Sequence, residues 1–309
     1  MRIIISEFMG DAAVAALAAR FDVAYDPTLA DRRDELKTKL ATADALIVRN
    51  RTQVDEDLLA AAVRLKVVGR LGVGLDNIDT DTCAARGIEV IPATGANAQA
   101  VAEYVIATAT LLLRSAYGAT ASVADGQWPR VALSNGREIG GTTLGLIGFG
   151  GIGRLTAKLG RALGMTVIGY DPQLPATSPV WAANHANART LDALLAEAGV
   201  ISLHVPLTDQ TRSLIDATRI ARMKQGAILI NTARGGVVDE TAVAAALRSG
   251  QLGGAALDVF EHEPLAAGSS LAGCPNLILT PHIAGLTRES NARVSTLIAE
   301  KVTAALAQR

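Results

Sequence analysis

The chain has 309 residues, which is long for a single hydrophobic core and predicts two domains. Half of the residues are hydrophobic, 19% are charged and the formal net charge is −1, so we expect a soluble globular protein with no electrostatic attraction to nucleic acid or membranes. Neither cysteine has metal or redox spacing, and no run resembles a signal peptide or a bilayer span, which predicts a cytoplasmic protein without a metal site.

The first part of the chain alternates short apolar runs with segments of helical periodicity. The apolar runs are RIIIS, FDVAYD, ADALIVRN, LKVVGRLG and GIEVIPA. Helices are expected at Asp11 to Arg20, at Arg32 to Thr42 and over residues 79–87. This alternation is typical of a parallel sheet with crossover helices.

A long apolar helix is expected from Asn97 to Tyr117, and the turn-like stretch DGQWPR follows it. The alternation then begins again. The next strand candidates are TTLGLIGFG, MTVIGYDP, VISLHVP, GAILINTARG, GGAALDVF and NLILTPH. The helices among and after them are expected at Ile152 to Leu163, Leu191 to Glu197, Asp239 to Ser249 and Thr287 to Ala307. The sequence therefore predicts a second parallel sheet in a domain that begins near residue 97.

A glycine pattern of the G-x-G-x-x-G type opens this second run. Gly148, Gly150 and Gly153 lie between an apolar strand and a helical segment, which is the setting of a dinucleotide-binding turn. Asp171 ends the following strand, 18 residues after Gly153, where an acid can accept hydrogen bonds from a ribose. Because a carboxylate there repels a 2′-phosphate and no arginine stands nearby, we expect NAD as the cofactor. The alternative is a purely structural strand–helix turn.

Polar residues follow the later strands, at the edge where doubly wound sheets bind ligands. They are His204, Pro206, Thr232, Arg234, Asp258, Glu263 and His282. Reduction of a ketone needs a proton donor, and histidine titrates near neutral pH. A carboxylate beside it favours the imidazolium, and an arginine holds a substrate carboxylate through paired hydrogen bonds. A capping Arg234, a solvated Glu263 or a half-buried His282 are the structural alternatives.

These stretches resemble the D-isomer-specific 2-hydroxyacid dehydrogenases. The resemblance is carried by RLGVGLDNID, NAQAVAEYVIA, LGLIGFGGIGR, VISLHVPLTDQTRSLI, MKQGAILINTARGGVVDE, GGAALDVFEHEPL and NLILTPHIAG, between residues 70 and 285. It implies an α/β protein in which a Rossmann cofactor domain, residues 98–284, is inserted into a flavodoxin-like substrate domain, residues 1–97 plus 285–309. Both domains would be doubly wound parallel sheets.

The resemblance also implies roles for individual residues. Arg234, Glu263 and His282 would be the catalytic trio, with His282 as the acid–base group that Glu263 orients. The cofactor would be bound by Gly148, Gly150, Gly151, Ile152, Gly153, Asp171, His204, Pro206, Thr211, Thr232, Arg234, Asp258 and His282, with Asp258 near the nicotinamide. The substrate would be bound by Arg49, Asn50, Arg51, Gly72, Val73, Gly74, Arg234 and His282. The helix from Asn97 would help to form a homodimer.

The stretch RNRT, at the end of a strand in the first domain, bears on the substrate. If the strand continues, Arg49 and Arg51 lie on one face and suit a substrate with a second anionic group. The stretch resembles phosphoglycerate dehydrogenases, and together with ISEFM it resembles sulfolactate dehydrogenases, so 3-phosphoglycerate and 3-sulfolactate are the candidate substrates. The absence of a C-terminal regulatory domain favours the second. The alternative is that Arg51 is solvated or pairs with Asp55 or Glu56.

Two other functions remain open from the sequence. A glyoxylate or hydroxypyruvate reductase would share the same fold and trio. A corepressor-like scaffold that senses NAD(H) would also keep the trio, although the short tails do not favour it.

Overall fold

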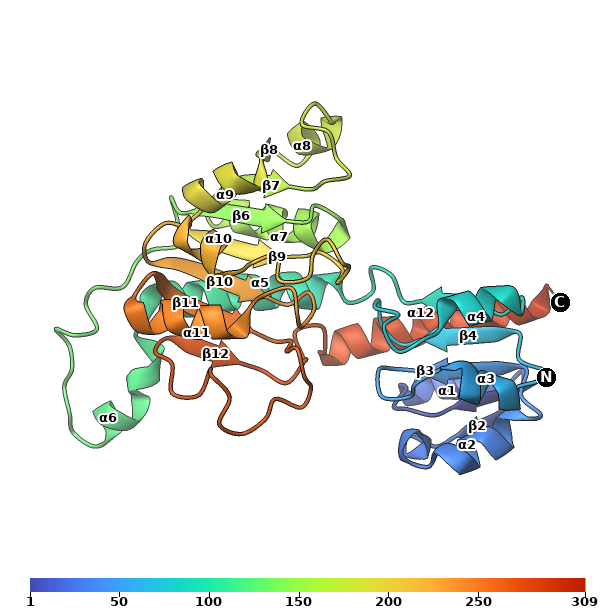
Figure 1. Cartoon of the computed structure of the whole chain (residues 1–309). Coiled ribbons are helices and arrows are strands. Elements are labelled where there is room, and N and C mark those ends of the chain that lie inside the picture. Colours follow the sequence, from blue (N-terminus) through green and yellow to red (C-terminus); the bar gives the residue numbers. More distant parts are fainter. Residues whose placement is uncertain (309) are drawn as a thin grey trace. The chain divides into compact units, whose positions relative to one another are not determined.

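The computed structural model describes residues 1–308, which form two units (Figure 1). Unit 1 comprises Met1–Asn97 together with the C-terminal segment from Leu286, and unit 2 comprises Ala98–Gly285. Unit 2 is therefore inserted in the sequence between the two segments that form unit 1. Both units are parallel sheets flanked by helices, so the expected α/β class is confirmed.

Unit 1 has the strand order β2-β1-β3-β4-β5, the order of flavodoxin-like sheets. Its strands are β1 (Arg2–Ile5), β2 (Asp22–Tyr25), β3 (Ala45–Val48), β4 (Val67–Arg70) and β5 (Glu89–Pro92). Its α-helices are α1 (Asp11–Ala18), α2 (Arg33–Leu40), α3 (Glu56–Ala61), α4 (Thr80–Ala85) and α12 (Arg288–Ala307), and a 3₁₀ turn, η1, covers Leu29–Asp31.

Alternation along the strands of unit 1 separates two hydrophobic cores. Ile3 and Ile5 pack with α1 and α12, whereas Ile4 packs with α2 and α3 on the other face of the sheet. Helix α12 lies tightly on β4, because a Cβ at Gly69 would come within 2.8 Å of Val302. The last helix of the chain is therefore part of the core of unit 1.

Unit 2 has the strand order β12-β11-β10-β9-β6-β7-β8, which contains the Rossmann order. Its strands are β6 (Thr143–Ile147), β7 (Thr166–Tyr170), β8 (Asn187–Ala188), β9 (Val200–Leu203), β10 (Ala227–Asn231), β11 (Leu252–Leu257) and β12 (Leu277–Leu279). Its α-helices are α5 (Ala98–Arg114), α6 (Thr120–Ala124), α7 (Gly151–Ala162), α8 (Pro179–Ala183), α9 (Leu191–Glu197), α10 (Ala217–Ala221) and α11 (Glu240–Ser249), with a 3₁₀ turn, η2, at Tyr117–Ala119.

All the pairings in this sheet are parallel, so the carboxyl ends of its strands share one edge. Leu146 and Ile230 face α5 and α7, while Ile147 and Leu229 face α9, α10 and α11. The strands are thus buried on both faces, which explains why they are almost continuously apolar in the sequence.

We predict that Gly145→Ala destabilises unit 2. A Cβ at this position in β6 would lie 2.7 Å from Leu194 and 2.8 Å from Ala198, which is closer than packed atoms tolerate. Overpacking of this kind costs about 1–3 kcal/mol, measurable as a lower urea midpoint. The control is Gly140→Ala, whose Cβ would meet its nearest neighbour at an ordinary 3.5 Å. Equal midpoints for the two variants would contradict this packing.

Candidate active site

The glycine turn between β6 and α7 has the geometry that a bound dinucleotide requires. Gly148 has a φ of 94°, and a Cβ there would lie 2.4 Å from the carbonyl oxygen of His204. A Cβ at Gly153 would lie 2.3 Å from the carbonyl oxygen of Gly148, whereas one at Gly150 would meet open space. The first and third glycines are therefore needed for packing, and the second leaves the backbone accessible to a phosphate.

The surroundings of the turn also fit a dinucleotide. Gly150 caps α7 without a side chain, so the positive end of the helix dipole, in the turn that contains Gly151 and Ile152, suits an anion. The Asp171 carboxylate accepts hydrogen bonds from the backbone N–H groups of Phe149 (2.8 Å) and Gln173 (2.9 Å). These bonds fix the carboxylate beside the turn and leave acceptor sites for hydroxyl groups.

The segment after β9 places an uncharged histidine next to the glycine turn. His204 Nε2 lies 3.1 Å from Ser202 Oγ, and burial lowers the pKa of the imidazole to about 4. Part of the residue is exposed, but protein atoms surround the ring. Because its pKa is about 4, the ring is neutral at neutral pH. Thr211 closes the following loop by donating its hydroxyl to the Pro206 carbonyl at 2.6 Å.

Thr232, directly after β10, carries a buried polar atom that lacks a protein partner. Its Oγ1 makes no hydrogen bond within residues 1–308. A buried hydroxyl without a partner is costly, so this atom is suited to a bound ligand. Together with the open space at Gly150 and the fixed Asp171 carboxylate, it shows that the side chains present fit the cofactor expected from the sequence.

Arg234 stands on a turn that a buried amide organises. Asn231, the last residue of β10, accepts the Ala233 N–H at 3.0 Å and donates to the Arg234 carbonyl at 2.9 Å. The Arg234 guanidinium donates from Nη1 to the Ala233 carbonyl at 2.6 Å. A Cβ at Gly235 would lie 1.8 Å from the carbonyl oxygen of Phe260, so this turn packs directly against the loop that leads to Glu263.

Glu263 and His282 form the carboxylate–imidazole pair expected from the sequence. Glu263 Oε2 lies 2.9 Å from His282 Nδ1, and Oε1 accepts the Phe260 N–H at 3.1 Å. The second bond fixes the carboxylate, and the first directs the imidazole. The side chains are 35% and 39% exposed, so the pair can reach a small molecule. With Nδ1 bound to the carboxylate, Nε2 is the ring nitrogen that can exchange a proton with a ligand.

A second carboxylate holds the backbone on which His282 stands. Asp258 is 1% exposed and accepts the Thr280 hydroxyl (2.6 Å) and the N–H groups of Ile283 and Ala284 (2.8 Å each). Its carbonyl oxygen accepts the His282 N–H at 2.8 Å. The residues on both sides of His282 are thus tied to Asp258, which stabilises the left-handed conformation of His282 (φ 56°).

Two partners that complete this arrangement were not identified from the sequence. Tyr104 on α5 lies 2.6 Å from Thr280 Oγ1 and acts as the donor, because that hydroxyl gives its own proton to Asp258. Asn231 was also missed. The carboxylate of Asp258, which is expected beside the nicotinamide, also holds the loop that carries His282. A threonine two residues before a strand-end histidine was the available signal in the sequence.

In unit 1, the expected face shared by Arg49 and Arg51 does not form. β3 ends at Val48, so strand alternation does not reach the two arginines. Arg51 forms an ion pair with Asp31 and its side chain is 54% exposed, whereas Arg49 is largely buried. Asp55, considered as a partner of Arg51, pairs with Arg33 instead. Asn50 lies between the two arginines, with its N–H directed to Glu7.

The Gly72–Gly74 stretch follows β4 in the same unit. A Cβ at Gly72 would lie 1.3 Å from Arg70 Nη1, so the Arg70 guanidinium packs directly on this loop. Val73 and Gly74 are partly exposed, which leaves backbone groups accessible. Arg70, which was not among the residues identified from the sequence, lies two residues before this expected substrate-binding loop.

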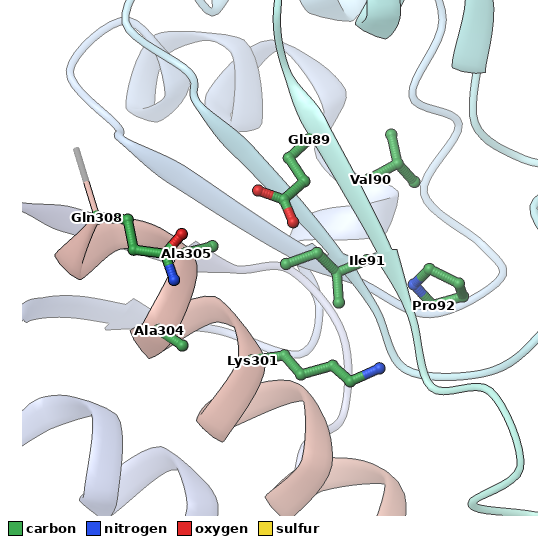
Figure 2. A pocket seen from close by; sticks show the side chains of 8 residues that line it. All are labelled: Glu89, Val90, Ile91, Pro92, Lys301, Ala304, Ala305 and Gln308. Carbon is green, nitrogen blue, oxygen red and sulfur yellow. The ribbon is translucent and has the colours of Figure 1, made fainter.

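A groove of about 380 Å³ in unit 1 lies between β5 and α12 (Figure 2). Figure 2 shows Glu89 and Ile91 on the strand side and Lys301 and Gln308 on the helix side. None of the candidate residues lines it. Within residues 1–308, no cluster of His, Cys, Asp and Glu could hold a metal ion, and no helix is long and apolar enough to cross a membrane.

The fold and the site of unit 2 define a dinucleotide-dependent oxidoreductase. The family model described as "D-isomer specific 2-hydroxyacid dehydrogenase, NAD binding domain" matches residues 106–284. The chain belongs to the D-isomer specific 2-hydroxyacid dehydrogenase family, as the resemblance indicated, and NAD is its cofactor.

The chain is similar over most of its length to three enzymes and to one solved structure. It is 53% identical to the (S)-sulfolactate dehydrogenase of Chromohalobacter salexigens over 99% of both chains. It is 42% identical to the hydroxypyruvate reductase of Thermotoga maritima over 87% of both. It is 41% identical to the D-3-phosphoglycerate dehydrogenase of Mycobacterium tuberculosis over 99% of this chain but 57% of that enzyme. The crystal structure of the TT0316 protein from Thermus thermophilus has a TM-score of 0.89, 35% identity and 100% and 98% coverage of the two chains.

We predict that Thr232→Val weakens NADH binding without destabilising the free protein. Removing an unsatisfied buried hydroxyl leaves the free energy of unfolding unchanged or raises it by up to about 1 kcal/mol. Losing a hydrogen bond to the cofactor raises the Kd for NADH by about fivefold to tenfold. Fluorescence titration and urea unfolding measure the two effects, with Thr241→Val on the exposed face of α11 as the control. An unchanged Kd would exclude Thr232 from cofactor binding.

Proposed function

We propose that this protein interconverts a 2-hydroxy acid and its 2-keto acid, and that the acid carries a second anionic group, with 3-sulfolactate and 3-sulfopyruvate as the preferred pair. The observation that carries the reaction is the 2.9 Å contact between Glu263 and His282. The substrate class is supported by the 53% identity to an (S)-sulfolactate dehydrogenase over nearly the whole chain. 3-Phosphoglycerate is the second substrate of this class.

The proton is handled by His282. When bound, NADH supplies the hydride that reduces the carbonyl carbon. Negative charge then develops on the carbonyl oxygen, and protonated His282 donates a proton to it from Nε2. Glu263 accepts the Nδ1–H, which orients the ring and leaves Nε2 to face the substrate oxygen. In the oxidation direction, neutral His282 removes the hydroxyl proton.

Other residues bind and orient. Arg234 pairs with the substrate carboxylate, and the backbone N–H groups of Val73 and Gly74 add donors to it. The Gly72 N–H, also expected to contribute, is already donated to the Arg70 carbonyl at 2.8 Å. Asp171 binds the ribose and excludes a 2′-phosphate, which selects NAD over NADP. We assign the remaining cofactor contacts to Gly148, Gly150, Gly151, Ile152, Gly153, His204, Pro206, Thr211, Thr232 and Asp258.

Arg49 is the residue that we assign to the second anionic group. Its guanidinium is largely buried, which strengthens its attraction for an anion compared with a solvated arginine. Arg51 already has a carboxylate partner in Asp31 and is a weaker candidate. Asn50 lies between them and can donate its side-chain amide to the same group.

The stereochemical labels are consistent with this assignment. In lactate the carboxylate outranks the methyl group, whereas in sulfolactate the sulfur makes the side-chain carbon outrank the carboxylate. The same arrangement around C2 is therefore called (R) in D-lactate and (S) in sulfolactate. An enzyme of a D-specific family is thus expected to act on (S)-sulfolactate.

A hydroxypyruvate or glyoxylate reductase is the second candidate function. It is favoured by the 42% identity to a hydroxypyruvate reductase. These substrates lack a second anionic group, so Arg49 would have no special role with them.

We further propose that the protein is a cytoplasmic homodimer. Four of the exposed large hydrophobic side chains, Tyr117, Val123, Trp128 and Val131, lie between α5 and β6, and exposed apolar groups of this kind favour burial against a second copy. Figure 1 shows α6 within a long loop that extends away from the rest of unit 2. The free cysteines Cys83 and Cys274 are consistent with a reducing compartment.

The substrate proposal is tested by initial rates of NADH oxidation with 3-sulfopyruvate, 3-phosphohydroxypyruvate, hydroxypyruvate and glyoxylate. We predict that a doubly anionic acid leads in kcat/KM by at least about tenfold, or about 1.4 kcal/mol of transition-state binding. Arg49→Ala should remove this lead, whereas the surface variant Arg20→Ala should keep it. If hydroxypyruvate or glyoxylate leads in the unmodified enzyme, the second candidate function is correct.

A further inference from the structure

A buried carboxylate lies beneath the loop that carries Arg49. Glu7 is 3% exposed and accepts hydrogen bonds from the backbone N–H groups of four successive residues. Oε1 accepts from Arg49 (2.8 Å) and Thr52 (3.0 Å), and Oε2 accepts from Asn50 (3.3 Å) and Arg51 (3.1 Å). Successive N–H groups that converge in this way form a concave anion site, and here the anion is a side chain of the same chain.

The carbonyl groups of the same loop are also held. Asn77 is 8% exposed and donates from Nδ2 to the Thr52 carbonyl (2.7 Å) and to the Arg49 carbonyl (3.3 Å). The hydroxyl groups of Ser6 and Thr52 lie 2.9 Å apart. Glu7 and Asn77 therefore fix both kinds of backbone group in residues 49–52, which leaves the loop little freedom to change conformation.

This fixed loop sets the direction of the Arg49 side chain. Its Nη2 donates to Asn291 Oδ1 at 2.6 Å, and its guanidinium carbon lies 5.7 Å from the centre of the Phe8 ring. Burial lowers the pKa of the guanidinium, and the negative charge of Glu7 opposes that shift. Glu7 thus acts on both the backbone and the charge of the residue assigned to the second anionic group.

We propose that Glu7 is a positioning residue for substrate selection, whose carboxylate shapes the Arg49–Thr52 loop so that Arg49 is held ready for a second anionic group. This inference rests on the proposed function. Glu7 is not among the residues assigned above to the substrate or the cofactor, and it acts through the loop that carries Arg49 and Asn50.

Two substitutions separate the features of the carboxylate. Glu7→Gln keeps the length of the side chain but replaces one acceptor oxygen by an NH₂ group. This group is only a donor, so the two backbone N–H groups that face it lose their acceptor. Glu7→Asp keeps the charge but is one methylene shorter, so it cannot reach all four N–H groups. Glu35→Gln, which removes an exposed carboxylate on α2 of the same unit, is the matched control.

The experiment measures KM and kcat for 3-sulfopyruvate and hydroxypyruvate in each variant. We expect Glu7→Gln to raise KM for 3-sulfopyruvate about tenfold and to change kcat and both constants for hydroxypyruvate less than twofold. Glu7→Asp should show an intermediate loss, and Glu35→Gln none. An equal rise in KM for both substrates would show that Glu7 has a merely structural role. A lower KM for 3-sulfopyruvate would show that the negative charge of Glu7 weakens binding of the anionic substrate. Either result overturns the proposal. If Glu7→Gln does not fold, Glu7→Asp carries the same comparison.

Amide hydrogen exchange distinguishes this inference from the proposed function. In the unmodified enzyme the amides of residues 49–52 should exchange slowly, and in Glu7→Gln they should exchange at least about tenfold faster. Fast exchange in the unmodified enzyme would overturn the role of Glu7 whatever the substrate. Slow exchange together with no preference for 3-sulfopyruvate over hydroxypyruvate would overturn the proposed function and, with it, substrate selection by Glu7.

Discussion

The acceptor bonds of one buried carboxylate, Asp258, determine the geometry of the catalytic end of unit 2. Because it binds the Thr280 hydroxyl and the N–H groups of Ile283 and Ala284, His282 can hold a backbone conformation that a non-glycine residue rarely adopts. Glu263 then has only to orient the imidazole. Glu263 orients the imidazole and Asp258 holds the loop that carries it, so the proton donor is positioned before a substrate binds.

Unit 1 uses the same physical solution. Glu7 binds four backbone N–H groups just beyond β3, as Asp258 binds two just beyond β12. In parallel sheets, the loops at the carboxyl ends of strands leave backbone donors that the sheet does not satisfy. A buried carboxylate satisfies several at once and leaves the loop rigid. The residues that we assign to ligands, Arg49 and His282, stand on loops of this kind.

Much of this architecture could be predicted from the sequence, because apolar alternation reports directly on buried parallel strands. The glycine turn, Asp171 and the pair of Glu263 and His282 were identified, since each depends on a short local pattern or on the family resemblance. Some helices were predicted one residue too long, because Asp239 and Thr287 are extended capping residues. Helices such as α3 and α10 are too short to show periodicity. The Asp31 partner of Arg51 and the bonds of Asp258 join residues about twenty positions apart, which no local pattern reveals.

The most direct test of the account is the turnover of His282→Ala with NADH and the best keto acid, together with its affinity for NADH. The account predicts that kcat for reduction falls by about a hundredfold or more, because the general acid is lost, while the Kd for NADH changes little. Near-normal kcat in a variant that still binds NADH would contradict the central claim that His282, held by Glu263 and Asp258, donates the proton.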